Sequence, residues 1–212
     1  MIYFIADPHL GYPGVTRWRS EFKDWRDHDA AFVERWNRTV SPRDTVYILG
    51  DFGGVSSGPA GDTRLHVVAT MVELNGTKHG LRGNHDDEGM LNKMLLTGGL
   101  DTLENYAEIK VQLTRGSGPS TKIVMCHYPL AAWNDAFRGS VMLHGHTHGT
   151  MVPVRGIRRL DLSAELLDLT PISQYQLPEA LEARGAWSNL DTSLLADGHD
   201  GLVEANRVWG SK

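Results

Sequence analysis

Short apolar runs alternate with longer amphipathic segments along this chain. Runs rich in β-branched and aromatic residues predict strands at 2–6, 45–49, 80–82, 104–113, 121–125 and 141–143. Apolar residues at helical spacing predict helices at 27–40, 63–74, 88–96 and 179–184. The segment 158–169 predicts either a strand pair or one bent strand. Such alternation of strands and helices is typical of an α/β domain.

The chain has the length of one domain. Its 212 residues are enough to bury a substantial core, and no repeat or linker-like tract divides them. We therefore expect a single domain over residues 1–186. Residues 187–212 show little periodicity, and we expect them to form a C-terminal tail of uncertain order.

Composition narrows the class of protein. The 21 Lys and Arg residues against 26 Asp and Glu residues give a formal charge of −5, which argues against a broad basic surface for nucleic acid. Apolar runs are too short for a transmembrane helix, and the N-terminus lacks the basic region of a secretory signal. The single Cys126 cannot form an internal disulfide. We expect a cytoplasmic protein with no membrane partner.

The chain carries ten histidines, and several of them belong to polar clusters that directly follow apolar runs. These clusters are residues 7–9, 50–51, 83–86, 127–129 and 144–148. Ligands of α/β proteins bind at the carboxyl ends of strands, so we expect the clusters to converge on one rim. Residues two apart on an extended segment point the same way, which pairs Asp7 with His9 and His146 with His148. The two side chains of each pair can therefore bind one ion from the same side.

A glycine lies immediately before the key polar residues of three clusters, at Gly50, Gly83 and Gly145. A position without a side chain lets the backbone turn sharply and approach a ligand closely. We therefore expect these glycines to lie against the site.

The order of these clusters resembles the calcineurin-like metallophosphoesterases, whose pattern is Asp-x-His, Gly-Asp, Gly-Asn-His-Asp/Glu, a lone His and Gly-His-x-His. Every part is present between residues 7 and 148, about two thirds of the chain. Segments 36–37, 45–51 and 126–130 look closest to small bacterial and phage-type members. The resemblance implies an α/β fold, a four-layer αββα sandwich of two mixed β-sheets flanked by helices.

The resemblance also implies two divalent metal ions with seven protein ligands. Asp7, His9, Asp51 and His148 would hold one ion, and Asp51, Asn84, His127 and His146 the other, with Asp51 as the bridge. Any one of these residues alone would be more typical of a polar turn at a strand end. Two divalent ions against two carboxylates leave a positive centre that attracts phosphate. The oxygen and nitrogen ligands suit Mn²⁺, Fe, Zn²⁺ or Ni²⁺, and we expect Mn²⁺ to serve best in vitro.

A centre of this kind implies a hydrolytic mechanism. Two metal ions can activate a bridging hydroxide for in-line attack on phosphorus and stabilise the leaving oxygen. The resemblance implies that His85 donates a proton to the leaving oxygen and that Asp86 orients it, with a structural hydrogen bond as the alternative role of His85. We expect His144 to be a strand-end residue rather than a ligand. The remaining histidines, at positions 28, 66, 79 and 199, are expected to be solvated or to lie on helix faces.

No cap-domain insertion separates the motifs, so we expect an open site. An open site favours phosphodiesters, with cyclic nucleotides, including 2′,3′-cyclic phosphates, as the leading candidates for a small phosphoester or nucleotide substrate. The alternatives are a phosphomonoesterase or protein phosphatase, a nuclease acting on nucleic acid ends, and a non-catalytic scaffold of the same fold. Candidate phosphate or base contacts are Arg17, Arg19, Arg82, Arg138 and Tyr128. The sequence does not indicate an oligomeric state.

One departure from the family pattern follows the Gly-Asp motif. Many members carry Arg or Asp a few residues after it, whereas this chain has Gly53 and Gly54. A contact made by that side chain is therefore either absent here or supplied from elsewhere.

Overall fold

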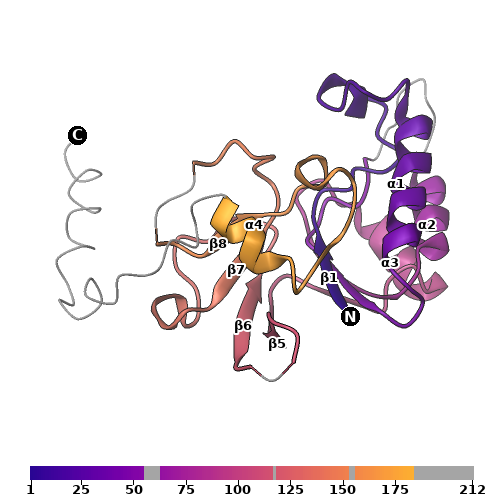
Figure 1. The fold of residues 1–212 in the computed structure, drawn as a ribbon. Coiled ribbons are helices and arrows are strands. Elements are labelled where there is room, and N and C mark those ends of the chain that lie inside the picture. Colours follow the sequence, from indigo (N-terminus) through magenta and orange to yellow (C-terminus); the bar gives the residue numbers. More distant parts are fainter. Residues whose placement is uncertain (55–62, 117, 153–155, 184–212) are drawn as a thin grey trace.

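Two β-sheets pack against each other, and helices flank them (Figure 1). The computed structural model describes residues 1–54, 63–116, 118–152 and 156–183. Both sheets contain parallel and antiparallel strand pairs, which confirms the expected fold of two mixed sheets with flanking helices. The expected tail at 187–212 lies outside the described residues.

Four of the five strands of the first sheet come from the N-terminal half of the chain. Its strands are β1 (Ile2–Ile5), β2 (Thr45–Ile48), β3 (Thr77–Leu81), β4 (Thr102–Glu104) and β9 (Ile172–Ser173). Their order is β4-β3-β2-β1-β9; β1 to β4 are parallel, and β9 pairs antiparallel with β1. The carboxyl ends of four strands therefore lie along one edge.

The second sheet contains β5 (Ala107–Gln112), β6 (Ser120–Met125), β7 (Val141–His144) and β8 (Arg159–Asp161), in that order. β5 is antiparallel to β6, while β6, β7 and β8 are parallel. The strand predicted over 104–113 is present as β5, but it begins at Ala107, and Glu104 instead ends β4 in the first sheet. The chain crosses between the sheets at residues 105–106. The pattern of strand-forming residues does not indicate this crossing.

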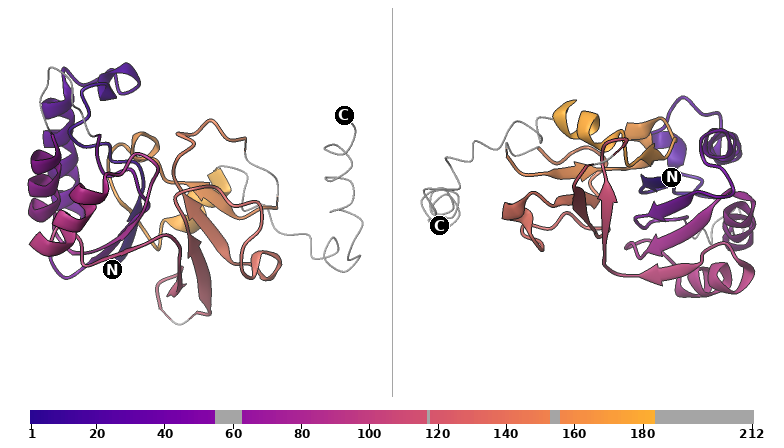
Figure 2. Two further views of the ribbon diagram at one scale, coloured as in Figure 1. Left: turned by 180° about the vertical axis from the view of Figure 1, so that it is seen from behind. Right: turned by 60° about the horizontal axis from the view of Figure 1, so that its bottom comes forward.

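Three helices cover the outer face of the first sheet: α1 (Trp25–Thr39), α2 (Arg64–Glu73) and α3 (Glu88–Thr97) (Figures 1 and 2). α1 begins two residues before its predicted start because the Asp24 carboxylate accepts hydrogen bonds from the backbone N–H groups of Arg26 and Asp27. The short helix α4 (Leu177–Ala183) lies beside β8.

Short elements account for the other differences from prediction. Segment 158–169 holds β8 and then the 3₁₀ helix Ala164–Leu167, so the predicted strand pair or bent strand is wrong beyond residue 161. The strand β9 has two residues, too few for a recognisable alternation. Two further 3₁₀ helices, Val15–Arg17 and Ala136–Arg138, lie in loops.

The apolar core has two layers, one on each face of the first sheet. One lies between this sheet and α1 to α3 and includes Ile5, Phe32, Trp36, Ile48 and Met71. The other lies between the two sheets and includes Phe4, Leu49, Met125, Leu143 and Leu160. β1 contributes to both layers because consecutive side chains point to opposite faces. Among the described helices, none has the length and apolar character needed to cross a membrane.

Candidate metal centre

The polar clusters come together where strands of both sheets end. Asp7 and His9 follow β1, Asp51 follows β2, and Asn84 follows β3. From the second sheet, His127 follows β6, and the pair at positions 146 and 148 follows β7. Parallel strands bring these carboxyl ends to a common edge, which explains why segments up to 141 residues apart meet.

One group of donor atoms surrounds Asp7. His9 Nε2 lies 4.0 Å from Asp7 Oδ1 and 3.9 Å from Asp51 Oδ2. His148 Nε2 lies 3.9 Å from the same Asp7 oxygen. These distances are too long for hydrogen bonds. They match two ligands of one ion, which are about 3 to 4 Å apart when each metal–ligand bond is about 2.1 Å.

A second group lies on the other side of Asp51. His127 Nε2 is 3.6 Å from Asp51 Oδ2 and 2.9 Å from Asn84 Oδ1. His146 Nδ1 is 2.8 Å from the same Asn84 oxygen. Asp51 Oδ2 therefore faces imidazoles of both groups, because His9 is its neighbour on the opposite side.

Two imidazoles in these groups fit a cation better than they fit protein partners alone. His9 Nε2 is buried and has no hydrogen-bond partner among the described residues. In His127, Nδ1 lies 2.8 Å from the Leu49 carbonyl oxygen, which accepts the one N–H of a neutral ring. Nε2 then presents a lone pair to the oxygen of Asn84, and a divalent cation between these atoms would bind both. The donor set therefore fits metal ions.

The backbone at the site is strained. Asp7, His9, Asp51, His146 and His148 have φ angles between +47° and +69°. Residues other than glycine rarely adopt this left-handed backbone conformation, and each instance costs about 1–3 kcal/mol. These turns point the polar side chains back towards one another at the sheet edge.

Glycines leave room for the two buried carboxylates. A Cβ atom at Gly83 would lie 2.1 Å from Asp51 Oδ1, and one at Gly145 would lie 2.2 Å from Asp7 Oδ2. Gly50 has a φ of +87°. All three glycines of the motifs therefore lie against the site, as the sequence predicts.

Hydrogen bonds behind the ligands fix their orientation. Ser163 Oγ lies 2.9 Å from Asp7 Oδ2, and His148 Nδ1 donates to Glu165. Burial raises the pKa of Asp7 to about 7 and lowers the pKa of His9 well below its usual range. The hydrogen bond with Glu165 raises the pKa of His148. A neighbouring cation would offset the cost of burying the Asp7 charge.

The structure gives Asp86 a different contact from the predicted one. Its carboxylate accepts backbone hydrogen bonds from Gly83 at 2.7 Å, Phe52 at 2.8 Å and Asp51 at 3.1 Å, rather than orienting the His85 ring. It thereby ties together the two loops that carry Asp51 and Asn84. Burial raises the pKa of Asp86 to about 6 even though these hydrogen bonds oppose the shift.

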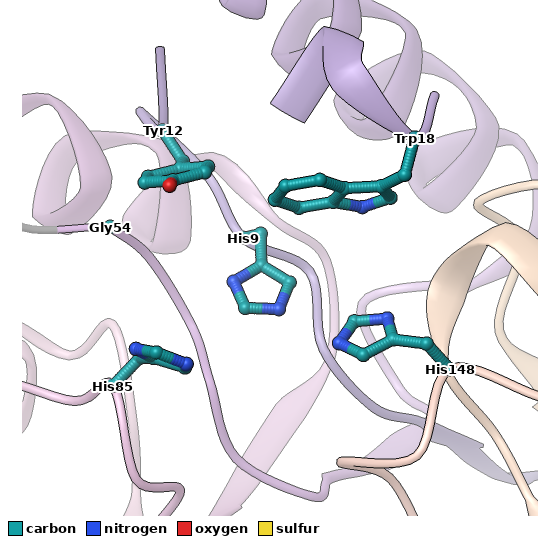
Figure 3. A pocket seen from close by; sticks show the side chains of 6 residues that line it. All are labelled: His9, Tyr12, Trp18, Gly54, His85 and His148. Atoms are coloured by element: carbon teal, nitrogen blue, oxygen red, sulfur yellow. The ribbon is translucent and has the colours of Figure 1, made fainter. Parts of the chain in front are cut away.

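A cavity of about 390 Å³ opens beside the first group (Figure 3). It is lined by His9, Tyr12, Trp18, Gly54, His85 and His148. Figure 3 shows three imidazoles on one side and the rings of Tyr12 and Trp18 on the other. The His85 side chain is exposed, while its backbone N–H donates to Asp51 Oδ1 at 2.8 Å. Tyr12 and Trp18 belong to no motif of the sequence, and their one signal there is their place in the loop after Asp7 and His9.

A family model described as calcineurin-like phosphoesterase matches residues 1–177. The chain belongs to this family. Its members are metal-dependent hydrolases of phosphoesters with a centre of two divalent metal ions. Two groups of side chains that share Asp7 are candidate ligands for such a centre: Asp7 with His9 and His148, and Asp7 with Asp51 and His127.

Small phage and archaeal proteins are similar to this phosphoesterase. The Gene 66 protein of Mycobacterium phage L5 is 29% identical over 173 residues, covering 74% of this chain and 82% of that protein. Uncharacterized protein MJ1445 of Methanocaldococcus jannaschii is 24% identical over 187 residues, covering 85% and 91%. The solved structure of AQ665, a protein of unknown function from Aquifex aeolicus, has a TM-score of 0.60 at 20% identity, covering 84% of this chain and 98% of that one. These similarities are consistent with a small phage-type member and the same fold.

The substrate contacts that the sequence suggests are four arginines and Tyr128, and their surroundings differ from one residue to the next. Tyr128 is 45% exposed at the site, with its ring centroid 4.8 Å from that of His146. Arg82 pairs with Glu88, and Arg138 lies 3.4 Å from Asp135. Arg17 is exposed at the end of the 3₁₀ helix that precedes Trp18.

Arg19 is not a phosphate contact, because its side chain is fully buried. His28 lies on helix α1, which agrees with one of the two expected positions, but its ring is fully buried rather than solvated, and its Nε2 lies 2.7 Å from Arg19 Nη1. His144 is buried at the end of β7, with Nδ1 2.8 Å from the Gly145 carbonyl oxygen. His199 lies outside the described residues.

Proposed function

We propose that this family member is a phosphodiesterase whose two metal ions share the Asp51 carboxylate. The observation that carries the proposal is the position of Asp51 Oδ2, 3.9 Å from His9 Nε2 and 3.6 Å from His127 Nε2. One carboxylate can therefore serve both donor groups. The proposed ligands are Asp7, His9, Asp51 and His148 for one ion, and Asp51, Asn84, His127 and His146 for the other.

Side chains around the ions have separate roles in the proposed reaction. The bound ions would supply positive charge for the phosphate and an activated water for attack on phosphorus. His85 lies on the cavity wall, where its imidazole can donate a proton to the leaving oxygen. Asp86 is a positioning residue, since it holds the loops of Asp51 and Asn84 together. Mn²⁺, Fe, Zn²⁺ and Ni²⁺ all suit the mixed oxygen and nitrogen ligands, and we expect Mn²⁺ to serve best in vitro.

Aromatic side chains on two sides of the centre support a preference for diesters. Trp18 lies beside His9 and His148, with ring centroids 5.8 Å and 6.2 Å apart. Tyr128 lies beside His127 and His146, with ring centroids 5.1 Å and 4.8 Å apart. A phosphodiester places organic groups on two of its oxygens, whereas a monoester has only one. Cyclic nucleotides, including 2′,3′-cyclic phosphates, are the first natural substrates to test, followed by nucleic acid ends.

The test is hydrolysis by protein stripped with a chelator and reloaded with Mn²⁺, Zn²⁺, Ni²⁺ or Mg²⁺. Rates on bis-p-nitrophenyl phosphate and p-nitrophenyl phosphate report diester and monoester hydrolysis. We expect metal-dependent turnover that is faster on the diester and is lost in His127→Ala. The matched control is His79→Ala, because His79 stacks on Tyr47 in the first sheet, away from the site.

Two results would contradict the proposal. A clearly faster rate on the monoester would make the protein a phosphomonoesterase. No turnover with any metal, despite measured occupancy of both metal sites, would favour a non-catalytic protein of the same fold.

A further inference from the structure

Tyr12 and Trp18 form an aromatic surface next to the proposed metal site. Their ring centroids are 5.5 Å apart, and the ring planes differ by 31°. The ring of Tyr12 lies 6.3 Å from that of His9, and the ring of Trp18 lies 5.8 Å from it. Figure 3 shows both rings above His9, across the cavity from His85 and His148. A molecule bound in the cavity would therefore contact the rings and the imidazoles together.

Two glycines hold the Tyr12 ring in place. A Cβ atom at Gly14 would lie 2.7 Å from Tyr12 Cε1, and one at Gly54 would lie 2.3 Å from Tyr12 Cδ2. Gly54 lies in the segment after the Gly-Asp motif. In this chain, the Tyr12 ring takes the space that a side chain there would need. The ring is therefore positioned before any ligand binds.

Trp18 is fixed by its neighbours although its side chain is open to solvent. It is 43% exposed, and its backbone N–H donates to the carbonyl oxygen of Val15, which is fully buried. The next residue, Arg19, is anchored by hydrogen bonds to the carbonyl oxygens of Asp7 and Pro8 at 2.7 Å and 2.9 Å. These contacts anchor the backbone around Trp18, which places an exposed indole at the mouth of the cavity.

The lining of the cavity indicates the chemistry of the group it would take. The described residues that line it are aromatic rings, imidazoles and one glycine, with no Lys, Arg, Asp or Glu. Such a lining offers stacking rather than ion pairs, so it suits a flat group of low charge. The volume of about 390 Å³ falls within the range of ligand pockets.

We propose that Tyr12 and Trp18 are a stacking site for a nucleobase, so that the substrate is a nucleotide phosphoester. The base would lie against these rings while its phosphate reaches the metal centre. This proposal rests on the proposed phosphoesterase function and adds the residues that would bind the base. Stacking of a base on aromatic side chains is worth about 1–3 kcal/mol, which corresponds to about 5-fold to 150-fold in affinity.

The test compares sugar phosphates with and without a base. Calorimetry of the metal-loaded protein would measure the Kd of ribose 5-phosphate and of adenosine 5′-monophosphate, together with adenosine 3′-monophosphate for the other attachment point. We expect at least one adenosine monophosphate to bind about 10-fold more tightly than ribose 5-phosphate. Trp18→Leu and Tyr12→Leu should remove most of this difference and leave the Kd of ribose 5-phosphate unchanged. Phe137→Leu, which changes a ring that is 61% exposed outside the site, is the matched control.

The outcomes separate this proposal from the function on which it rests. Equal affinities for ribose 5-phosphate and both adenosine monophosphates would overturn the stacking site, even if bis-p-nitrophenyl phosphate is hydrolysed in a metal-dependent way. Loss of metal occupancy in Trp18→Leu, with equal weakening of all ligands, would also overturn it and make the indole a shield for His9 and His148. Absence of metal-dependent hydrolysis would instead count against the phosphoesterase function.

Discussion

His148 Nδ1 donates a hydrogen bond to Oε1 of Glu165, which lies 17 residues further along the chain. The other carboxylate oxygen accepts a hydrogen bond from Arg19 Nη2 at 2.6 Å. Burial alone would raise the pKa of Glu165, but the hydrogen bond with His148 and the charge of Arg19 lower it to about 2. The carboxylate therefore stays ionised and keeps His148 Nε2 directed towards Asp7.

Glu165→Gln should weaken metal binding. The amide keeps the size of the side chain but removes the charge that orients His148, and changes of this kind typically cost about 10-fold to 100-fold in metal affinity. Competition with a chelating dye measures the affinity of each variant. Glu34→Gln is the matched control, because the Glu34 side chain is 73% exposed and pairs with Arg38 on the surface of α1. Equal affinity in wild type and Glu165→Gln would show that His148 needs no such partner.

Arg19→Met should destabilise the fold. The buried guanidinium donates to the carbonyl oxygens of Asp7 and Pro8 and to Glu165, and removing it leaves a carboxylate without its cation. We expect the free energy of unfolding to fall by about 3–5 kcal/mol, measured by urea denaturation of the metal-free protein. Arg38→Met removes an arginine that is 67% exposed and should change it by about 0.5 kcal/mol or less. A loss of similar size in both variants would contradict this role of Arg19.

Gly83→Ala should abolish metal binding and lower the stability of the fold. The added Cβ would lie 2.1 Å from Asp51 Oδ1 and 2.4 Å from the Asp51 backbone nitrogen, so both the carboxylate and the loop that carries it must move. Metal analysis after dialysis and far-UV circular dichroism measure the two effects separately. Gly89→Ala is the control, since its Cβ would meet only Asp87 Oδ1, at 3.2 Å. Full metal occupancy in Gly83→Ala would mean that this close approach does not constrain Asp51.

His85→Ala should retain metal and slow hydrolysis, most strongly for poor leaving groups. The backbone N–H that binds Asp51 is kept in this variant, whereas the imidazole that can protonate the leaving oxygen is lost. General acids contribute about 10²-fold to 10⁴-fold, and less when the leaving group is already a good one. A series of aryl phosphodiesters with different phenol pKa values measures this dependence. An unchanged dependence on the leaving group would assign His85 a structural hydrogen bond instead.

Local patterns in the sequence predicted most of the strands and the residues that follow them. β1, β2, β6 and β7 are short apolar runs, and each passes directly into a polar cluster. Their parallel arrangement brings the cluster residues to one edge. This position is expected, because ligands of α/β proteins bind at the carboxyl ends of strands. The glycines at positions 83 and 145 were also recognisable, because the polar residues next to them require a close backbone approach.

Other features depend on contacts that no local pattern records. Glu104, the first residue of the predicted strand 104–113, belongs to β4 in the first sheet rather than to β5, and which sheet a residue joins depends on packing at a distance. The sequence motif indicated Asp86 as a site residue. Its hydrogen bonds with the backbone of residues 51, 52 and 83 could be identified only in the folded structure. Its neighbour in the sequence, His85, points into the cavity instead.

The sequence by itself determined the fold class, most of the strands and the candidate ligands, because periodicity and motif chemistry act over a few residues. The tertiary structure decided how these parts combine. Arg19 meets Glu165 across 146 residues, and Tyr12 meets Trp18 only because the loop after β1 folds back over His9. Such pairings arise when the packing of two sheets and their helices fixes the loops in space, so they belong to the folded chain as a whole.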